Sequence, residues 1–396
     1  MKDSLKVAFL AFVCFATSIS EFAIVGTLDV VAASLGVSVS MAGQLLTAFS
    51  LSGGIGVPLA VIALSRLDRR VVMAASLASV ALGCLLVSLT SSFALIVAAR
   101  VLMAIGSGVF TVCSFAAAPG LARKGREASA IATVTLGFNA ALVLGLPFGR
   151  LLVGILPWTA VFWFVGIASA VLVPVVLAII PPQSAAARRP VPLSRQLAVL
   201  KRPELLAVFA LTLFWTAGYA MMYAYITPYL QETSALEGSA LSGALLAYGL
   251  STLVGNKVGG ALADRFGARR AIVPALLVQA AMLAALFALR GPAWLVVASI
   301  LLWGVCAWIP APAINVAVIR ASGETPDTAL SLKNSVTQLA YAIGSGLGGA
   351  VIAVGATHGL CLAAMAPVAA AAVSAVYAAR GDEGVRGTPA VVAESA

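Results

Sequence analysis

The chain has 396 residues, of which 62% are hydrophobic and only 10% are charged, and its mean hydropathy is +1.07. Soluble globular domains carry roughly 25% charged residues, so this composition excludes a soluble domain. The net charge of +10 does not indicate nucleic-acid binding, because the basic residues form short clusters between apolar runs. Five cysteines lie in apolar stretches without a CxxC pair, which indicates neither a disulfide framework nor a metal site.

Charge and turn clusters divide the sequence into apolar segments close to the ~20 residues that a bilayer-spanning helix needs. The first half contains segments at 7–27, 41–63, 72–91, 94–116, 129–153 and 160–180. The second half contains segments at 205–227, 241–262, 271–289, 294–316, 328–354 and 359–379. This pattern predicts an all-α integral membrane protein with twelve transmembrane helices.

Lysine and arginine gather in alternate loops, which predicts the orientation of the chain in the membrane. If the N-terminus is cytoplasmic, nearly all basic residues fall inside. The outer loops then hold only Arg290 and, at a helix end, Arg150. We therefore expect both termini to face the cytoplasm.

The two halves of the chain resemble each other at an offset of about 200 residues. Arg69 and Arg70 correspond to Arg269 and Arg270, and Gly149 corresponds to Gly349. The sequence predicts two pseudo-symmetric six-helix bundles, at 1–180 and 205–380, joined by a basic cytoplasmic linker at 181–204. A disordered cytoplasmic tail is expected at 381–396. Two parallel halves place a transport site between them near the bilayer midplane, so this organisation indicates a transporter.

The stretch at 260–270 reads GALADRFGARR. It resembles the loop signature G-x-L-a-D-R-x-G-x-R-R of the major facilitator superfamily. The whole chain resembles the drug and proton antiporter branch of that family, which includes bacterial arabinose and sugar efflux proteins. The resemblance implies a cytoplasmic gating motif made by Gly260, Asp264, Arg265, Gly267, Arg269 and Arg270. Asp264 can accept charge-assisted hydrogen bonds or face a helix N-terminus, whereas membrane topology alone also explains the two final arginines.

The corresponding loop of the first half departs from this pattern. It contributes Arg66, Asp68, Arg69 and Arg70 to the predicted gating motif, but Leu64 stands where the family has aspartate. Asp68 is a candidate for a displaced carboxylate that latches this loop.

Two further segments carry the resemblance. The segment at 94–116 contains Arg100, which resembles the intramembrane arginine of antiporters. The segment at 129–153 resembles the antiporter signature through Gly137, Gly145, Pro147 and Gly149. Glycines and alanine recur there every four residues, so one helix face allows close backbone approach. Such a face serves helix packing, rocking of the halves, or both.

Glu21 is the candidate for proton coupling, because it lies inside the first apolar segment. Cys14, Thr17 and Ser18 share its helical face. An ionised carboxylate near the bilayer centre costs at least ~2.5 kcal/mol. We expect Glu21 to alternate between a protonated state and a substrate-occupied state. The alternative is a carboxylate near the outer interface that snorkels or pairs with Arg150.

Arg100 is expected to act as a counter-ion or proton-transfer partner of Glu21, with an anchor near a helix end as the alternative. Polar stripes and aromatic faces supply the candidates for a substrate cavity, and helix packing is the alternative for the aromatic ones. The candidates are Asn139, Trp215, Tyr219, Tyr223, Asn334, Gln338 and Tyr341.

These observations predict a proton-coupled exporter of a small organic molecule such as a sugar or drug, working by alternating access in the bacterial inner membrane. The alternatives are an importer on the same fold and a membrane sensor or enzyme. The sequence holds neither a G-x-x-x-x-G-K-[ST] loop nor a G-x-S-x-G elbow, so we expect no enzyme activity. We expect no metal, no cofactor other than the coupling proton, and no nucleic-acid partner. A monomer in the lipid bilayer is expected.

Overall fold

The computed structural model describes residues 3–122, 126–182, 202–288, 292–322 and 326–385. Twelve helices in this part of the chain are long and apolar enough to cross a membrane. The prediction of an all-α fold with twelve spans is therefore confirmed. The predicted linker and tail lie largely outside the described residues, so the boundaries of the two bundles stay a prediction.

The described residues of the first half form eight α-helices and one π-helical turn. In chain order these are α1 (Asp3–Gly26), α2 (Leu28–Leu35), α3 (Val39–Leu51), η1 (Ser52–Gly56), α4 (Val57–Ala63), α5 (Arg69–Leu89), α6 (Phe93–Leu121), α7 (Glu127–Leu152) and α8 (Ala160–Ile179). The turn η1 joins α3 and α4 into one membrane span.

The second half again begins with a long helix followed by a short one. Its helices are α10 (Pro203–Tyr223), α11 (Ile226–Ser234), α12 (Gly238–Phe266), α13 (Ala268–Ala288), α14 (Ala293–Trp308), α15 (Pro310–Ser322), α16 (Pro326–Ala353), the 3-10 turn η4 (Thr357–Gly359) and α17 (Leu360–Val385). The predicted segment at 294–316 is two helices, which meet at Ile309. Pro310 has no backbone N–H to continue the helical hydrogen bonds.

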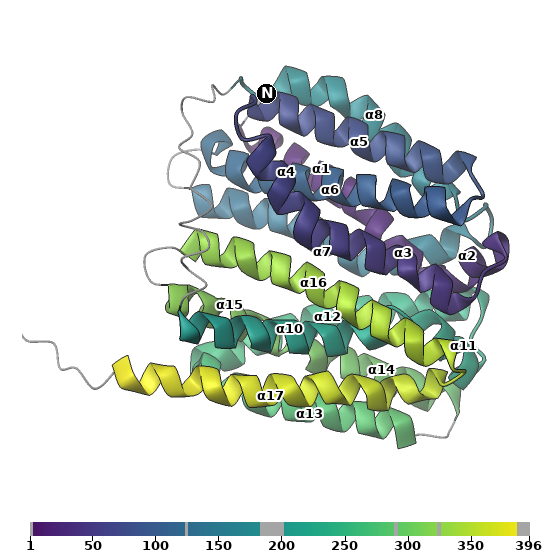
Figure 1. Cartoon of the computed structure of the whole chain (residues 1–396), viewed down its shortest axis with the longest axis vertical. Coiled ribbons are helices and arrows are strands. Elements are labelled where there is room, and N and C mark those ends of the chain that lie inside the picture. The colour runs from purple at the N-terminus through teal and green to yellow at the C-terminus, as the bar shows by residue number, and fades with distance from the viewer. Residues whose placement is uncertain (1–2, 123–125, 183–201, 289–291, 323–325, 386–396) are drawn as a thin grey trace, which may run out of the picture.

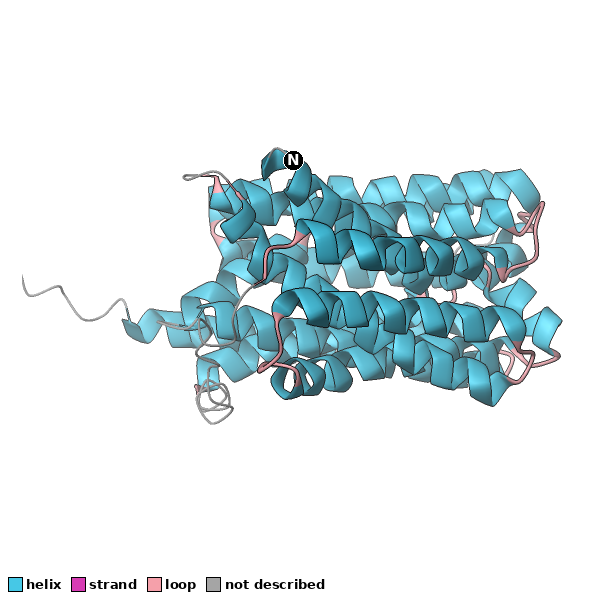
Figure 2. Cartoon of the chain, turned by 90° about the horizontal axis from the view of Figure 1, so that it is seen from above, coloured by secondary structure: helices cyan, strands magenta, loops and turns pink. Residues whose placement is uncertain are grey.

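The helices pack as two groups that lie one above the other in Figure 1, with α1–α8 in purple and blue and α10–α17 in teal to yellow. Contacts between the groups run chiefly from α3 to α16 and from α7 to α12. We call this interface the seam. Figure 2 shows that the long helices of both groups run side by side. The end of the helices that carries α2 and α11 is called the distal end, since α1 begins and α17 ends at the opposite end.

Candidate functional site

Glu21 is buried on α1, with 6% of its surface exposed. Its carboxyl group lies within electrostatic range of the Arg100 guanidinium and faces the Gln338 amide of α16. The Glu21 carboxyl group is also within electrostatic range of Tyr223 of α10 and Tyr341 of α16. An acid from one half of the chain therefore meets polar groups of the other half at the seam.

Arg100 of α6 is fully buried, so the anchor near an exposed helix end does not describe it. Its Nη1 donates to the Ser20 carbonyl at 2.7 Å and its Nε approaches the Leu45 carbonyl at 3.5 Å. The guanidinium carbon lies 4.3 Å from the centre of the Phe49 ring, a cation–π arrangement. Helices α1 and α3 thus hold the arginine next to Glu21. Its Nη2 has no hydrogen-bond partner among the described residues.

Aromatic rings gather in the second half of the chain, opposite these charges. Tyr219 stacks on Tyr223 with ring centres 5.2 Å apart and on Trp303 at 5.6 Å. Tyr341 meets Tyr219 edge-on at 6.1 Å. Three predicted residues, Tyr219, Tyr223 and Tyr341, therefore share one cluster. It also contains Trp303, which the sequence reasoning missed.

The same cluster extends to Tyr248 and Trp308. The Tyr248 hydroxyl donates to the Tyr219 hydroxyl at 3.1 Å, and Trp308 lies edge-on to Tyr219 and Trp215. Trp215 donates its indole N–H to the Ala307 carbonyl at 3.0 Å, which ties it to α14. Trp303 and Tyr248 had no periodic signal in the sequence. Trp303 and Trp308 stand five residues apart on α14, and Phe266, the other aromatic residue of α12, is exposed.

The remaining three cavity candidates, Asn139, Asn334 and Gln338, are less buried. Asn139 on α7 is half-buried and Asn334 on α16 is exposed. Gln338, one helical turn beyond Asn334, is half-buried and packs beside Gly53 of the π-helical turn: a Cβ at Gly53 would lie 3.1 Å from the Gln338 amide nitrogen. Of the predicted polar stripe on α16, Gln338 and Tyr341 are thus the members placed near Glu21.

The loop before α5 is held by its arginines. Asp68 caps α5 by accepting from the Arg70 backbone N–H at 2.8 Å, which accounts for its place at the helix start. Arg69 donates to the Ala116 carbonyl at 2.8 Å and Arg70 to the Leu177 carbonyl at 3.3 Å. The two arginines therefore tie α5 to α6 and α8, while Arg66 is exposed.

In the corresponding loop of the second half, Asp264, Arg265 and Arg270 are exposed. Gly267 has φ +82°, a backbone conformation that favours glycine and that turns α12 into α13. Among the described residues, no neighbouring atom lies within 4 Å of a Cβ placed at Gly260. The side chain of Arg269 falls outside the described residues. The gating role of this loop stays a prediction.

The antiporter-like glycines of α7 pack against α1. A Cβ at Gly145 would lie 2.7 Å from the Phe22 Cβ, and one at Gly149 would lie 2.6 Å from the Ala23 carbonyl oxygen. Gly137 is pressed in the same way against Ala11 of α1. This face therefore fixes the helix that carries Glu21.

Pro147 acts at the other side of α7. Because proline has no N–H, the carbonyl of Val143 lacks its usual helical donor. That oxygen lies against α12, where a Cβ at Gly249 would stand 2.6 Å from it. Proline and glycine thus allow backbone-to-backbone contact across the seam.

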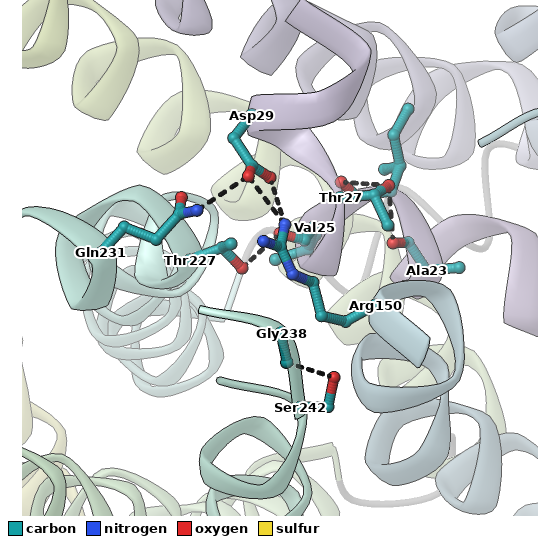
Figure 3. Close-up of polar contacts among 10 residues, drawn as sticks. Ala23, Val25, Thr27, Asp29, Arg150, Thr227, Gln231, Gly238 and Ser242 are labelled. Carbon is teal, nitrogen blue, oxygen red and sulfur yellow. Dashed lines mark hydrogen bonds and ion pairs between the residues drawn. The ribbon is translucent and has the colours of Figure 1, made fainter. Parts of the chain in front are cut away.

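At the distal end, Arg150 forms an ion pair with Asp29 at 2.7 Å. The alternative that Arg150 pairs with Glu21 is therefore wrong. Asp29 also accepts from the Gln231 amide of α11 at 2.9 Å, as Figure 3 shows. Neither Asp29 nor Gln231 stood out in the sequence, since each lies at the border between an apolar segment and a polar loop, where polar residues are ordinary.

The fold and the buried charged site define a multi-pass membrane transporter. The family model described as Major Facilitator Superfamily matches residues 10–345, so the chain belongs to the major facilitator superfamily. The proteins to which it is similar are transporters and not enzymes, which confirms the expectation of no enzyme activity.

Relatives match along most of the chain. The MFS-type transporter YbcL of Bacillus subtilis is 33% identical over 352 residues, 89% of this chain and 90% of the relative. The inner membrane transport protein YdhP of Escherichia coli is 29% identical over 360 residues, 90% of each chain. A chloramphenicol resistance protein of Streptomyces lividans is 33% identical over 65% of this chain and 66% of its own. The helices and these relatives indicate an inner membrane protein.

A solved structure has the same fold. A bacterial homologue of the human lysosomal transporter Spinster superposes with a TM-score of 0.78 at 15% sequence identity, covering 98% of this chain and 99% of its own. At that identity the likeness shows the architecture and no more.

Proposed function

We propose that the protein is a proton-coupled exporter, which moves a small organic molecule out of the cytoplasm in exchange for protons by alternating access. Both termini face the cytoplasm in this proposal, because the basic loops lie at the end opposite the distal end. The protein works as a monomer, and the proton is its only coupling agent.

The observation that carries the proposal is the position of Glu21. It is a buried acid on α1, and the groups around it come from both halves of the chain. Rocking of the halves would change the surroundings of its carboxyl group. Intramembrane acids in such positions serve as proton relays, so one residue can sense both the proton and the cargo.

The energy available is sufficient for export. One proton that crosses a potential of ~100 mV releases ~2.3 kcal/mol. At ~1.4 kcal/mol per tenfold, this sustains a gradient on the order of 50-fold for a neutral substrate. Nucleotide hydrolysis is then unnecessary.

The substrate would lie between Glu21 and Arg100 of the first half and the aromatic cluster around Tyr219 of the second half. Tyr219, Tyr223 and Tyr341 offer ring faces and hydroxyl groups, which suit a ring-bearing molecule with polar substituents. A sugar and an amphipathic drug both have this character. The chloramphenicol resistance protein among the relatives favours testing antibiotics first.

Thermal-shift screening of the purified protein against sugars, nucleosides and antibiotics finds the ligand, because a selective ligand stabilises the folded state. Proteoliposomes of known orientation then measure proton movement when that ligand is added. An exporter moves protons against the direction of ligand flow. Movement of both in the same direction establishes the importer, and ligand binding without any flux establishes a sensor.

A further inference from the structure

Asp29 bridges the two halves of the molecule at the distal end (Figure 3). Its carboxylate accepts from Arg150 Nη1 at 2.7 and 2.8 Å, and Arg150 belongs to the same half. The Asp29 carboxylate also accepts from Gln231 Nε2 at 2.9 Å, and Gln231 belongs to the other half. One carboxylate thus joins an arginine of α7 to a glutamine of α11.

The ion pair holds the carboxylate in place. Arg150 lies in the last turn of α7 and Asp29 in the first turn of α2, where the helix dipoles favour a cation and an anion respectively. The side chains are 10% and 23% exposed. With Arg150 and Asp29 fixed by their own half, the bond to Gln231 is the part of this network that can break when the halves separate.

A second bond lies one helical turn away. The Thr227 hydroxyl of α11 donates to the Val25 carbonyl at 3.0 Å, and Thr227 stands four residues before Gln231, on the same face of α11. Both bonds run from α11 to the chain around the α1–α2 junction. They therefore form or break together.

Two further hydrogen bonds join the halves nearby, between α3 and α16. Ser40 donates to the Gly349 carbonyl at 2.6 Å, and the Thr47 and Ser345 hydroxyls are 2.8 Å apart. These hydrogen bonds across the seam all lie in the distal half of the molecule.

We propose that Asp29 is a positioning residue of the transport cycle: oriented by Arg150, it captures Gln231 and holds the distal end shut. Opening of this end breaks the Asp29–Gln231 and Val25–Thr227 bonds, while the Asp29–Arg150 pair stays within its half. The inference rests on the alternating access of the proposed function. It adds the residues that decide how strongly one of the two states is held.

The test measures distances between spin labels at Ala33→Cys on α2 and Ala240→Cys on α12, both exposed at the distal end, in protein reconstituted into nanodiscs. Gln231→Leu removes the donor at similar size. Each state gives its own label-to-label distance. We expect the ratio of the open population to the closed population to rise about three- to tenfold, as for the loss of one partly exposed hydrogen bond to a charge. Gln231→Lys, which offers Asp29 a cationic donor, keeps the closed distance.

The matched control is Glu232→Gln, an exposed neighbour on the same helix, which leaves the distances unchanged. The proposal is overturned if Gln231→Leu gives the wild-type distances, if Glu232→Gln opens the end equally, or if Gln231→Lys opens it as much as leucine does. The measurement needs neither ligand nor proton gradient. Failure of Glu21 as the coupling residue would therefore leave its result intact.

Discussion

Arg100 shows how one residue can be held as a charge inside a membrane-spanning bundle. Its guanidinium combines a short hydrogen bond to the Ser20 carbonyl with a contact over the Phe49 ring. Planar geometry makes both interactions possible at once, which lysine cannot reproduce. The carboxyl group of Glu21 therefore lies within electrostatic range of a fixed positive charge.

We predict that Arg100→Lys lowers stability by about 1–3 kcal/mol. The shorter lysine ammonium cannot bond to the Ser20 carbonyl and lie flat on the Phe49 ring at the same time, as the guanidinium does. Thermal unfolding of the purified protein measures the change. Lys257→Ala, at an exposed cation of α12, is the control and should stay within about 0.5 kcal/mol of wild type. Equal melting temperatures for Arg100→Lys and wild type would show that the side chain is not held as described.

At this scale, sequence reasoning could identify Glu21 and Arg100 because a charge within an apolar segment is rare. It could not identify Asp29, Gln231 or Trp303. Their importance arises from partners on other helices, and a single sequence does not reveal how helices are rotated about their axes.

Among the helices, α7 packs against two different helices through two different faces. One face presents Gly145 and Gly149 to α1, and Pro147 frees a carbonyl that faces Gly249 of α12. Helix α7 therefore connects α1, on which Glu21 lies, to the seam. The glycine spacing predicted a close approach, but the partner helix became known only from the structure.

We predict that Gly149→Ala destabilises the protein by about 1–3 kcal/mol, because the added methyl group meets the Ala23 backbone. The matched substitution is Gly243→Ala on α12, where nothing lies within 4 Å of the new carbon. It should be neutral or stabilise by up to about 1 kcal/mol. Chemical or thermal unfolding of both variants checks the difference, and equal effects would contradict close α1–α7 packing.

Hydropathy predicted the spans well, because length and apolarity decide membrane insertion. It missed the π-helical turn at Ser52–Gly56 and the breaks after Tyr223 and Trp308. These features depend on local backbone geometry, which a window average does not detect. The break after Tyr223 also separates α11 from α10, and α11 carries the Gln231 that bonds to Asp29.

In the whole molecule, the two halves repeat a plan but divide the chemistry. The first half supplies Glu21 and Arg100, and the second supplies the rings around Tyr219 and the amide of Gln338. The internal repeat predicted the shared plan. It did not predict this division, since symmetry says nothing about which half keeps a charge.

The most direct test of the central claim compares wild type with Glu21→Gln in proteoliposomes, using the ligand found by thermal shift. Two quantities are measured: transport driven by an imposed pH gradient, and ligand-for-ligand exchange without a gradient. If the Glu21 proton is exchanged for cargo, Glu21→Gln loses gradient-driven transport and its pH dependence but retains exchange. Gradient-driven transport that persists in Glu21→Gln with the wild-type pH profile would contradict the account.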